Sequence, residues 1–228
     1  MIIALIVLVL IGAGLIFISP MLAMRPSKTG PISGTNIMAV NNGMVAVYLV
    51  KTDGGYIMID SGPDAIKFEA SLAGAGVKPD EIKWILLTHS DSDHTGALSL
   101  FPEAEIYMGR DELPLLDGTT KRSFRGGNKM PSGIRIDKIN LLSDGQQVSF
   151  DRASIKCISA PGHTPGSMLY LLDEKYLFTG DAIRIGKNNK VHPFTMNSAQ
   201  SMKTIDRLKE TVNRSLIVLT SHYGIKTN

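Results

Sequence analysis

The sequence predicts an α/β fold in which helices cover β-sheets, and two features of the chain indicate it. Runs rich in β-branched and aromatic residues alternate with segments of helical periodicity, and this order occurs in each half of the chain. Acidic residues and histidines directly follow several of the apolar runs. Because a strand end directs such residues into a crevice, the same pattern also predicts where a site lies.

The chain begins with an apolar segment, residues 2–24, which only Ser19 and Pro20 interrupt. At about 1.5 Å per helical residue it is long enough to cross a bilayer core of about 30 Å. We therefore predict a transmembrane anchor over residues 1–24. A cleaved signal peptide is the competing interpretation, but the segment lacks a positively charged start and a small-residue cleavage site before Arg25.

The charges beside this segment bear on its orientation. Arg25 and Lys28 follow the span, whereas only the α-amino group precedes it. The positive-inside tendency favours a cytoplasmic C-terminal domain, on the strength of two charges. Residues 25–35 are rich in proline, serine, glycine and threonine, which predicts a linker.

Residues 36–228 are enough for one well-buried domain and too few for two of ordinary size. The hydrophobic fraction of the whole chain, 43%, includes the apolar segment, so the remainder has an ordinary globular composition. The net charge of +3 is too small to indicate nucleic-acid binding. Cys157 is the single cysteine, which excludes an intramolecular disulfide, and we expect it in the core of a strand.

The predicted elements alternate along this domain. Strands are expected over 39–50 and 56–60, joined by a hairpin turn at Asp53-Gly54-Gly55. Next come a helix over 65–75, a strand over 82–88, a short helix over 94–100 and a strand over 104–108. The second half repeats this order with strands between 147 and 178, a final helix over 198–212 and a last strand over 216–219.

The densest group of chemically active residues lies in the segment Thr88–Gly96, directly after an apolar run. His89, Asp91 and Asp93 are spaced two apart, so an extended backbone directs them to one side. A tight turn can then bring His94 to the same point. Imidazole and carboxylate groups suit divalent cations. Taken alone, the segment fits either a metal site or a polar loop that caps the following helix.

Three later segments also place a histidine or an aspartate just past a β-rich run. They supply His163, Asp181 and His222, and Asp60 ends an earlier strand in the same way. With these residues the chain resembles the metallo-β-lactamase-fold hydrolases, whose signature is His-x-His-x-Asp-His followed by a single His, a single Asp and a last His. The resemblance runs from about Asn36 to the C-terminus.

The resemblance implies an αββα sandwich with a metal site at one edge, between two sheets. It also implies two divalent metal ions, zinc first with manganese or iron as alternatives, and a hydroxide between them as the nucleophile. By similarity, Asp93, Asp181 and Asp60 are the expected catalytic carboxylates. The first ion would be held by His89, Asp91 and His163, the second by Asp93, His94 and His222, and Asp181 would bridge them.

Asp91 is the one departure, because it stands where the usual pattern has its second histidine. Two divalent ions, three carboxylates and a hydroxide would make the centre formally neutral, where the usual pattern carries one positive charge. The added oxygen ligand favours manganese or iron, although the affinity order still favours zinc.

Two further residues have open roles. Asp60 fits an acceptor that fixes the tautomer of a ligand imidazole, but capping of the turn at Gly62 is an equal alternative. His192 follows Asp181 by about ten residues. Because the implied ligand set is complete without His192, we expect either a substrate contact or proton relay, or an ordinary loop residue.

The most basic stretch of the chain runs from Lys121 to Lys138, with only Asp137 acidic. It is either a solvated loop, a lid that attracts an anionic substrate, or a patch that lies on anionic lipid. Arg125, within this stretch, is a candidate substrate contact.

The sequence around His163 and Asp181 looks most like the glyoxalase II and lactonase-like branches, which cleave thioesters and lactones. The leading prediction is therefore hydrolysis of an ester, thioester or lactone by a membrane-tethered enzyme with a small-molecule substrate. A phosphodiesterase or nuclease-like hydrolase is the alternative, favoured by the basic stretch and by Asp91. A non-catalytic metal-binding domain is a third possibility, against which the complete ligand set argues.

Overall fold

The computed structural model describes residues 23–122, 134–184, 191–212 and 216–227. Within these ranges no helix combines the length and the apolar character needed to cross a membrane. The predicted anchor, residues 1–24, lies outside the described residues except for Ala23 and Met24.

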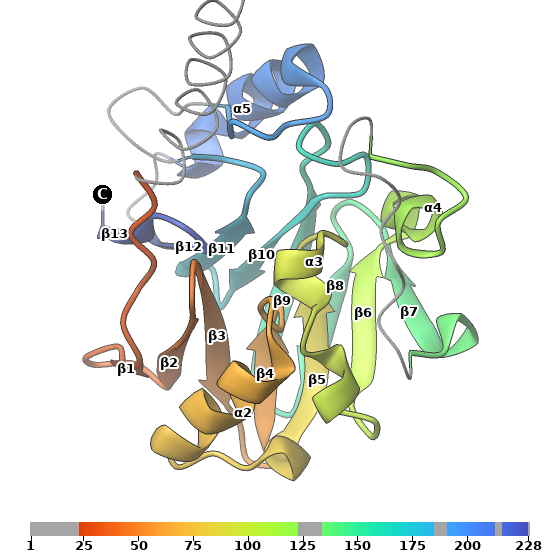
Figure 1. Cartoon of the computed structure of the whole chain (residues 1–228). Coiled ribbons are helices and arrows are strands. Elements are labelled where there is room, and N and C mark those ends of the chain that lie inside the picture. The colour runs from red at the N-terminus through yellow and green to blue at the C-terminus, as the bar shows by residue number, and fades with distance from the viewer. Residues whose placement is uncertain (1–22, 123–133, 185–190, 213–215, 228) are drawn as a thin grey trace, which may run out of the picture.

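One sheet has, among the described residues, seven strands whose spatial order follows the chain. Its first four strands are antiparallel, and β4 to β7 run parallel to one another. The strands are β1 (Gly30–Pro31), β2 (Ile37–Asn42), β3 (Val45–Lys51), β4 (Tyr56–Ile59), β5 (Ile82–Leu87), β6 (Glu105–Gly109) and β7 (Ile139–Leu142) (Figure 1).

The other sheet has six strands within the described ranges, in the order β13-β12-β11-β10-β9-β8. Only the β11–β12 pair is parallel in this part of the chain. The strands are β8 (Gln147–Phe150), β9 (Ala153–Ser159), β10 (Met168–Leu172), β11 (Tyr176–Gly180), β12 (Ile217–Thr220) and β13 (Gly224–Thr227).

Helices cover the outer faces of both sheets. The longer ones are α2 (Ala65–Gly74) and α5 (Ser198–Val212), and α2 begins where the Asp64 side chain accepts a hydrogen bond from the Lys67 backbone N–H. The shorter elements are α3 (Ser92–Thr95), α4 (Leu113–Leu116) and four 3₁₀ turns, at Pro79–Glu81, Leu98–Leu100, Arg110–Glu112 and Ile136–Lys138.

Three apolar clusters join these layers. The first lies between the sheets and contains Tyr48 and Phe178, whose ring centroids are 5.6 Å apart. The second packs Phe68 of α2 on the seven-stranded sheet, and the third packs Leu208 of α5 on the six-stranded sheet. Full burial of such a side chain stabilises the fold by about 1.5–3 kcal/mol. The order helix, sheet, sheet, helix confirms the predicted αββα sandwich.

Local details differ from the sequence prediction. The run 39–50 is a β2–β3 hairpin that turns at Gly43, where φ is 74°. In place of the short helix expected over 94–100, the chain forms α3 (Ser92–Thr95) and a 3₁₀ turn at Leu98–Leu100. Gly96, between them, allows a close approach to the carbonyl of Pro63 that a Cβ would prevent. Residues 25–35, predicted as a linker, contain β1, and the Arg25 N–H donates to the carbonyl of His222 at 2.7 Å.

Candidate metal centre

The ends of the parallel strands place the predicted site residues. Asp60 follows β4, Thr88 to His94 follow β5, Asp181 follows β11, and the loop after β12 carries His222. His163 comes from the loop between β9 and β10. Because parallel strands end at one edge of a sheet, residues far apart in the sequence meet there.

The structure brings all seven predicted ligand residues into two groups. Within each group the candidate ligand atoms lie within 4.8 Å of one another, and all but Asp93 belong to buried residues. The first group is His89, Asp91 and His163, and the second is Asp93, His94, Asp181 and His222.

The second group has buried polar atoms without a hydrogen-bond partner in the described part of the chain. Nε2 of His94 and of His222 and Oδ1 of Asp181 make no hydrogen bond among the described residues. Asp181 Oδ2 lies 3.2 Å from His222 Nε2 and 3.7 Å from His94 Nε2. Buried polar atoms are normally paired. Imidazole nitrogens and carboxylate oxygens that converge without partners fit a divalent cation.

Hydrogen bonds on the opposite ring nitrogens orient these imidazoles. His94 Nδ1 lies 2.8 Å from Asp60 Oδ2, and His222 Nδ1 lies 2.7 Å from the carbonyl of Met44. A ring that donates its Nδ1–H to such an acceptor presents its Nε2 lone pair to the pocket.

Asp60 reaches a second histidine through Thr88. The Thr88 hydroxyl donates to Asp60 Oδ2 at 2.9 Å and lies 3.0 Å from His89 Nδ1. The Thr88 backbone N–H also donates to Asp60 Oδ1 at 2.8 Å. Asp60 adopts a φ of 62°, an uncommon conformation for a residue other than glycine. These contacts place Asp60 behind the imidazoles, as one of its two predicted roles requires.

A family comparison agrees with this geometry. The model described as "Metallo-beta-lactamase superfamily" matches residues 40–222. The chain belongs to the metallo-β-lactamase superfamily. Its class is therefore that of metal-dependent hydrolases.

Individual relatives have low sequence identity to this chain. The chain is 28% identical to the probable polyketide biosynthesis zinc-dependent hydrolase PksB of Bacillus subtilis, over 62% of this chain and 57% of that protein. It is 29% identical to a hydroxyacylglutathione hydrolase of Shewanella loihica, over 78% of this chain and 62% of that protein. The chain thus spans less than two thirds of either relative.

Among solved structures, the fold is similar to that of BJP-1, a subclass B3 metallo-β-lactamase of Bradyrhizobium japonicum. The TM-score is 0.68 at 21% identity, over 88% of this chain and 79% of that one. At this identity the likeness concerns the fold alone.

Buried charges set the protonation of this superfamily site. Burial alone would raise the pKa of Asp181, but His192, His222 and His94 hold it well below its usual range. Burial alone would lower the pKa of His222, but Asp181 and Asp93 raise it to about 10. The pKa of His94 is also raised well above its ordinary value, against the effect of burial, by Asp60, Asp93 and Asp181. In the metal-free protein these two histidines therefore hold protons at neutral pH.

The fifth histidine lies at the site as well. His192 is buried, and its Nε2 is 3.5 Å from Asp181 Oδ2, which puts His192, His163 and Asp181 in a third possible ligand group. Burial lowers the pKa of His192 to about 4, so the ring is neutral at physiological pH. The ligand set implied by the sequence is complete without His192, whereas the position of His192 beside Asp181 leaves a metal role open. Arg125 lies outside the described residues.

Two buried residues at the site, Arg122 and Glu112, were not predicted individually from the sequence. Arg122 belongs to the basic stretch, but it is buried and its Nε donates to Asp91 Oδ1 at 2.8 Å. Glu112 accepts hydrogen bonds from the Ser90 backbone N–H and hydroxyl at 2.8 and 2.7 Å, and from the Gly166 N–H at 3.0 Å. It therefore joins the loop after β5 to the loop that carries His163.

Replacement of Glu112 by alanine is expected to destabilise the fold by about 3 kcal/mol, because it removes the acceptor of three buried hydrogen bonds. Glu112→Gln keeps one oxygen acceptor and should cost roughly half as much. Urea unfolding measures both. As a control, Glu105→Ala removes an exposed carboxylate that accepts only from Tyr107. Equal effects of Glu112→Ala and Glu105→Ala would contradict the proposed link between the loops.

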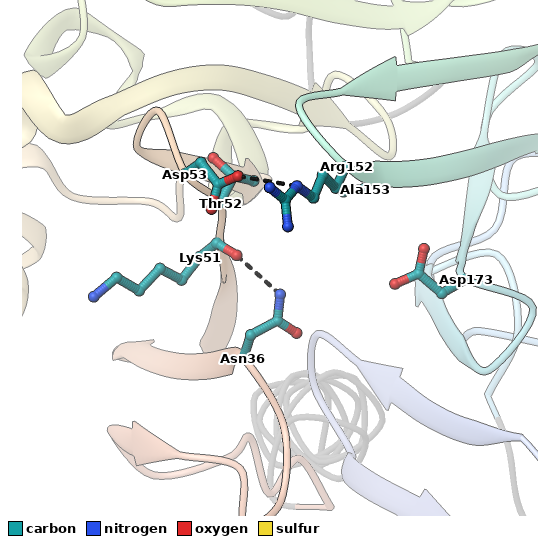
Figure 2. Close-up of a pocket in the computed structure, with 7 residues that line it drawn as sticks. All are labelled: Asn36, Lys51, Thr52, Asp53, Arg152, Ala153 and Asp173. Atoms are coloured by element: carbon teal, nitrogen blue, oxygen red, sulfur yellow. Dashed lines mark hydrogen bonds and ion pairs between the residues drawn. The ribbon is translucent and has the colours of Figure 1, made fainter.

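A hollow of about 360 Å³, separate from the metal centre, lies beside the end of β3 at Lys51, the start of β9 at Ala153 and the turn at Asp173 (Figure 2). Asp53 and Arg152 form an ion pair of 3.3 Å across it, and both side chains are exposed. Such a pair contributes little to stability. Its lining residues include no histidine, so this hollow does not share the chemistry of the metal centre.

Proposed function

We propose that the protein hydrolyses an ester, thioester or lactone with the help of a divalent cation. Zinc is the first candidate, with manganese or iron as alternatives. The observation that carries this proposal is the convergence of three buried atoms without a hydrogen-bond partner in the described residues: His94 Nε2, His222 Nε2 and Asp181 Oδ1. The ligand set would be Asp93, His94, Asp181 and His222.

An ion bound there would lower the pKa of a water molecule and polarise the substrate carbonyl. The chain's own residues prepare for this. Asp93 and Asp181 are ionised, because neighbouring histidines keep the pKa of each carboxyl low despite burial. Asp60 and the Met44 carbonyl hold His94 and His222 in the tautomer that faces the pocket.

The rest of the pocket favours an acyl substrate. Its free space is about 40 Å³, enough for only a few water-sized groups. Met24, Met44 and Phe194 line it together with the histidines and aspartates. A substrate whose carbonyl reaches the polar cluster would place its carbon chain against these apolar residues. The two relatives described above, a probable zinc-dependent hydrolase and a hydroxyacylglutathione hydrolase, support this class.

A substrate panel tests the proposal. The full-length protein in detergent would be loaded with zinc, manganese or iron in turn and given esters, thioesters, lactones and phosphodiesters. We expect turnover of one of the three acyl classes, and none by the Asp181→Ala variant. Preference for a phosphodiester would favour the nuclease-like alternative, and metal binding without any turnover would favour a non-catalytic domain.

Metal binding is expected to release about two protons near pH 7, because His94 and His222 must each lose a proton before Nε2 can ligate. Apparent metal affinity should therefore rise as the pH rises from 6 to 8. Titration calorimetry in buffers of different ionisation enthalpy counts these protons. The same metal added to Asp181→Ala should release almost none. A pH-independent affinity would contradict the ligand roles of both histidines.

We also propose that residues 1–24 anchor the protein in a membrane, with Met24 at the end of the anchor lining the pocket, and that 36–228 form the catalytic domain. Residues 25–35 would link the two while β1 pairs with β2. The intact protein should sediment with membranes, resist high salt and dissolve in detergent, because burial of apolar side chains is not weakened by salt. Release by salt alone, or a mature N-terminus beyond residue 24, would contradict the anchor. The charges at Arg25 and Lys28 favour a cytoplasmic domain.

A further inference from the structure

Arg122 lies inside the first ligand group, where the family pattern would place a metal ion. Its Nε donates to Asp91 Oδ1 at 2.8 Å, and its Nη2 lies 3.1 Å from His163 Nε2. Nη2 also donates to the carbonyl of Phe194 at 2.9 Å. One buried guanidinium thus connects the loop after β5, the loop after β9 and the segment before α5.

These contacts use the atoms that a metal ion would need. Arginine has only N–H donors, so His163 Nε2 must be the acceptor in its contact with Arg122. A ring nitrogen has one lone pair and cannot give it to an N–H and to a metal at the same time. Of the first group, His89 is the residue whose Nε2 keeps no hydrogen bond within the described part of the chain.

The second group is different. Its free atoms on His94, His222 and Asp181 face one another with no hydrogen bond from the described residues. The ion pairs of Asp93 and Asp181 in the described ranges involve histidines alone. The second group therefore has more ligand atoms available to a cation than the first group, although the sequence pattern implies one ion in each group.

The position of the Arg122 charge leads to the same distinction. The guanidinium lies against Asp91 and His163, where the family pattern would place the first ion. A divalent ion in that group would lie beside a buried cation, and like charges repel strongly where water is excluded.

We infer that the Arg122 guanidinium takes the place of a metal ion in the first ligand group, here called the first position. The chain therefore binds one divalent ion instead of two, at Asp93, His94, Asp181 and His222. The inference rests on the ligand set of the proposed function. The Asp91–Arg122 pair carries no net charge, like the neutral histidine that usually stands at position 91. Unlike that histidine, the pair leaves the first position closed to a metal.

Metal stoichiometry tests this inference. Full-length protein and variants would be dialysed against excess zinc or manganese, and bound metal would be measured by elemental analysis. We expect about one ion in the wild type and about two in Arg122→Met, which removes the guanidinium. Arg122→Lys keeps the charge and should stay at one. Arg135→Met, which removes an exposed arginine paired with Asp137, is the matched control and should also stay at one.

Electron paramagnetic resonance of manganese-loaded protein gives a second readout that does not depend on activity. The wild type should give the six-line signal of an isolated Mn²⁺, and Arg122→Met should give the signal of a spin-coupled pair. Because Arg122→Met leaves Asp91 buried without its partner, it can fail to fold. The double variant Asp91→His/Arg122→Met removes both charges, restores the family's histidine and is expected to bind two ions.

Each outcome decides the matter. Two ions in the wild type would overturn the inference and leave the proposed function intact. No bound ion in the wild type would overturn the proposed ligand set itself. One ion in the wild type, with no gain in Arg122→Met or in the double variant, would mean that Arg122 does not close the first position.

Discussion

Replacement of Asp181 by alanine is expected to weaken metal binding by more than about 100-fold and to reduce hydrolysis to background. Loss of a residue that merely supports a ligand weakens metal binding by roughly 10- to 100-fold, and loss of a ligand should exceed that. Asp181 is the most central carboxylate of the site, because its Oδ2 lies within 3.7 Å of the Nε2 atoms of four histidines: His94, His163, His192 and His222.

The effect has a clear electrostatic origin. Asp181 is a principal cause of the raised pKa of His222, so its removal also lowers that pKa. Four imidazoles would then surround a position without its shared negative charge. Calorimetric metal titration and hydrolysis of the preferred acyl substrate measure the two losses separately.

Two variants sharpen this test. Asp181→Asn keeps an oxygen that can ligate weakly but removes the charge, so it should fall between wild type and Asp181→Ala. Asp206→Ala removes an exposed carboxylate that pairs with Lys209 and should leave both metal affinity and activity unchanged. If Asp181→Ala kept wild-type metal affinity, Asp181 would not be a ligand, and the proposed ligand set would be wrong.

Much of this site is predictable because most of its residues follow a strand signal in the adjacent sequence. Asp60, His89, Asp181 and His222 each come one or two residues after a strand of β-branched and apolar residues, so strand prediction places each at a strand end, and the family resemblance implies that these ends share one edge. The order of the motifs then identifies the family. The long helix over 198–212 was predicted for a similar reason, since its apolar residues recur at helical spacing.

The missed features are those that depend on distant partners. The missed strands β7 and β13 each lie at one edge of a sheet, are four residues long, are only partly buried and have no clear alternation of apolar residues. Glu112 has no local signature, because its hydrogen-bond donors lie 22 and 54 positions away. Arg122 sits among other basic residues, and only the folded chain distinguishes a buried guanidinium from a solvated one. A metal role for His192 was not predicted, because the family pattern is complete without it. Only the fold shows that His192 is buried beside Asp181.

Replacement of Asp60 by asparagine is expected to weaken metal binding by roughly 10- to 100-fold while leaving the fold intact. Asparagine is nearly isosteric and tolerates the φ of 62° observed at this position, so the backbone need not change. One amide oxygen can still accept from the Thr88 N–H. The amide NH₂ would then face His94 Nδ1, which donates its proton to the Asp60 carboxylate in the wild type.

An amide N–H and an Nδ1–H cannot hydrogen-bond to each other, because both are donors. The variant would therefore favour the His94 tautomer that carries its proton on Nε2, and this tautomer has no Nε2 lone pair for the metal. The expected result is a large loss of metal affinity. The urea midpoint of the metal-free protein should also fall, because the buried His94 imidazolium loses the charge of its partner at 2.8 Å. Thr88→Val removes only the path from Asp60 to His89. If Arg122 closes the first position, Thr88→Val should weaken metal binding far less than Asp60→Asn, because His89 then holds no ion. Comparable losses in the two variants would instead indicate that His89 is a working ligand and that both positions are filled.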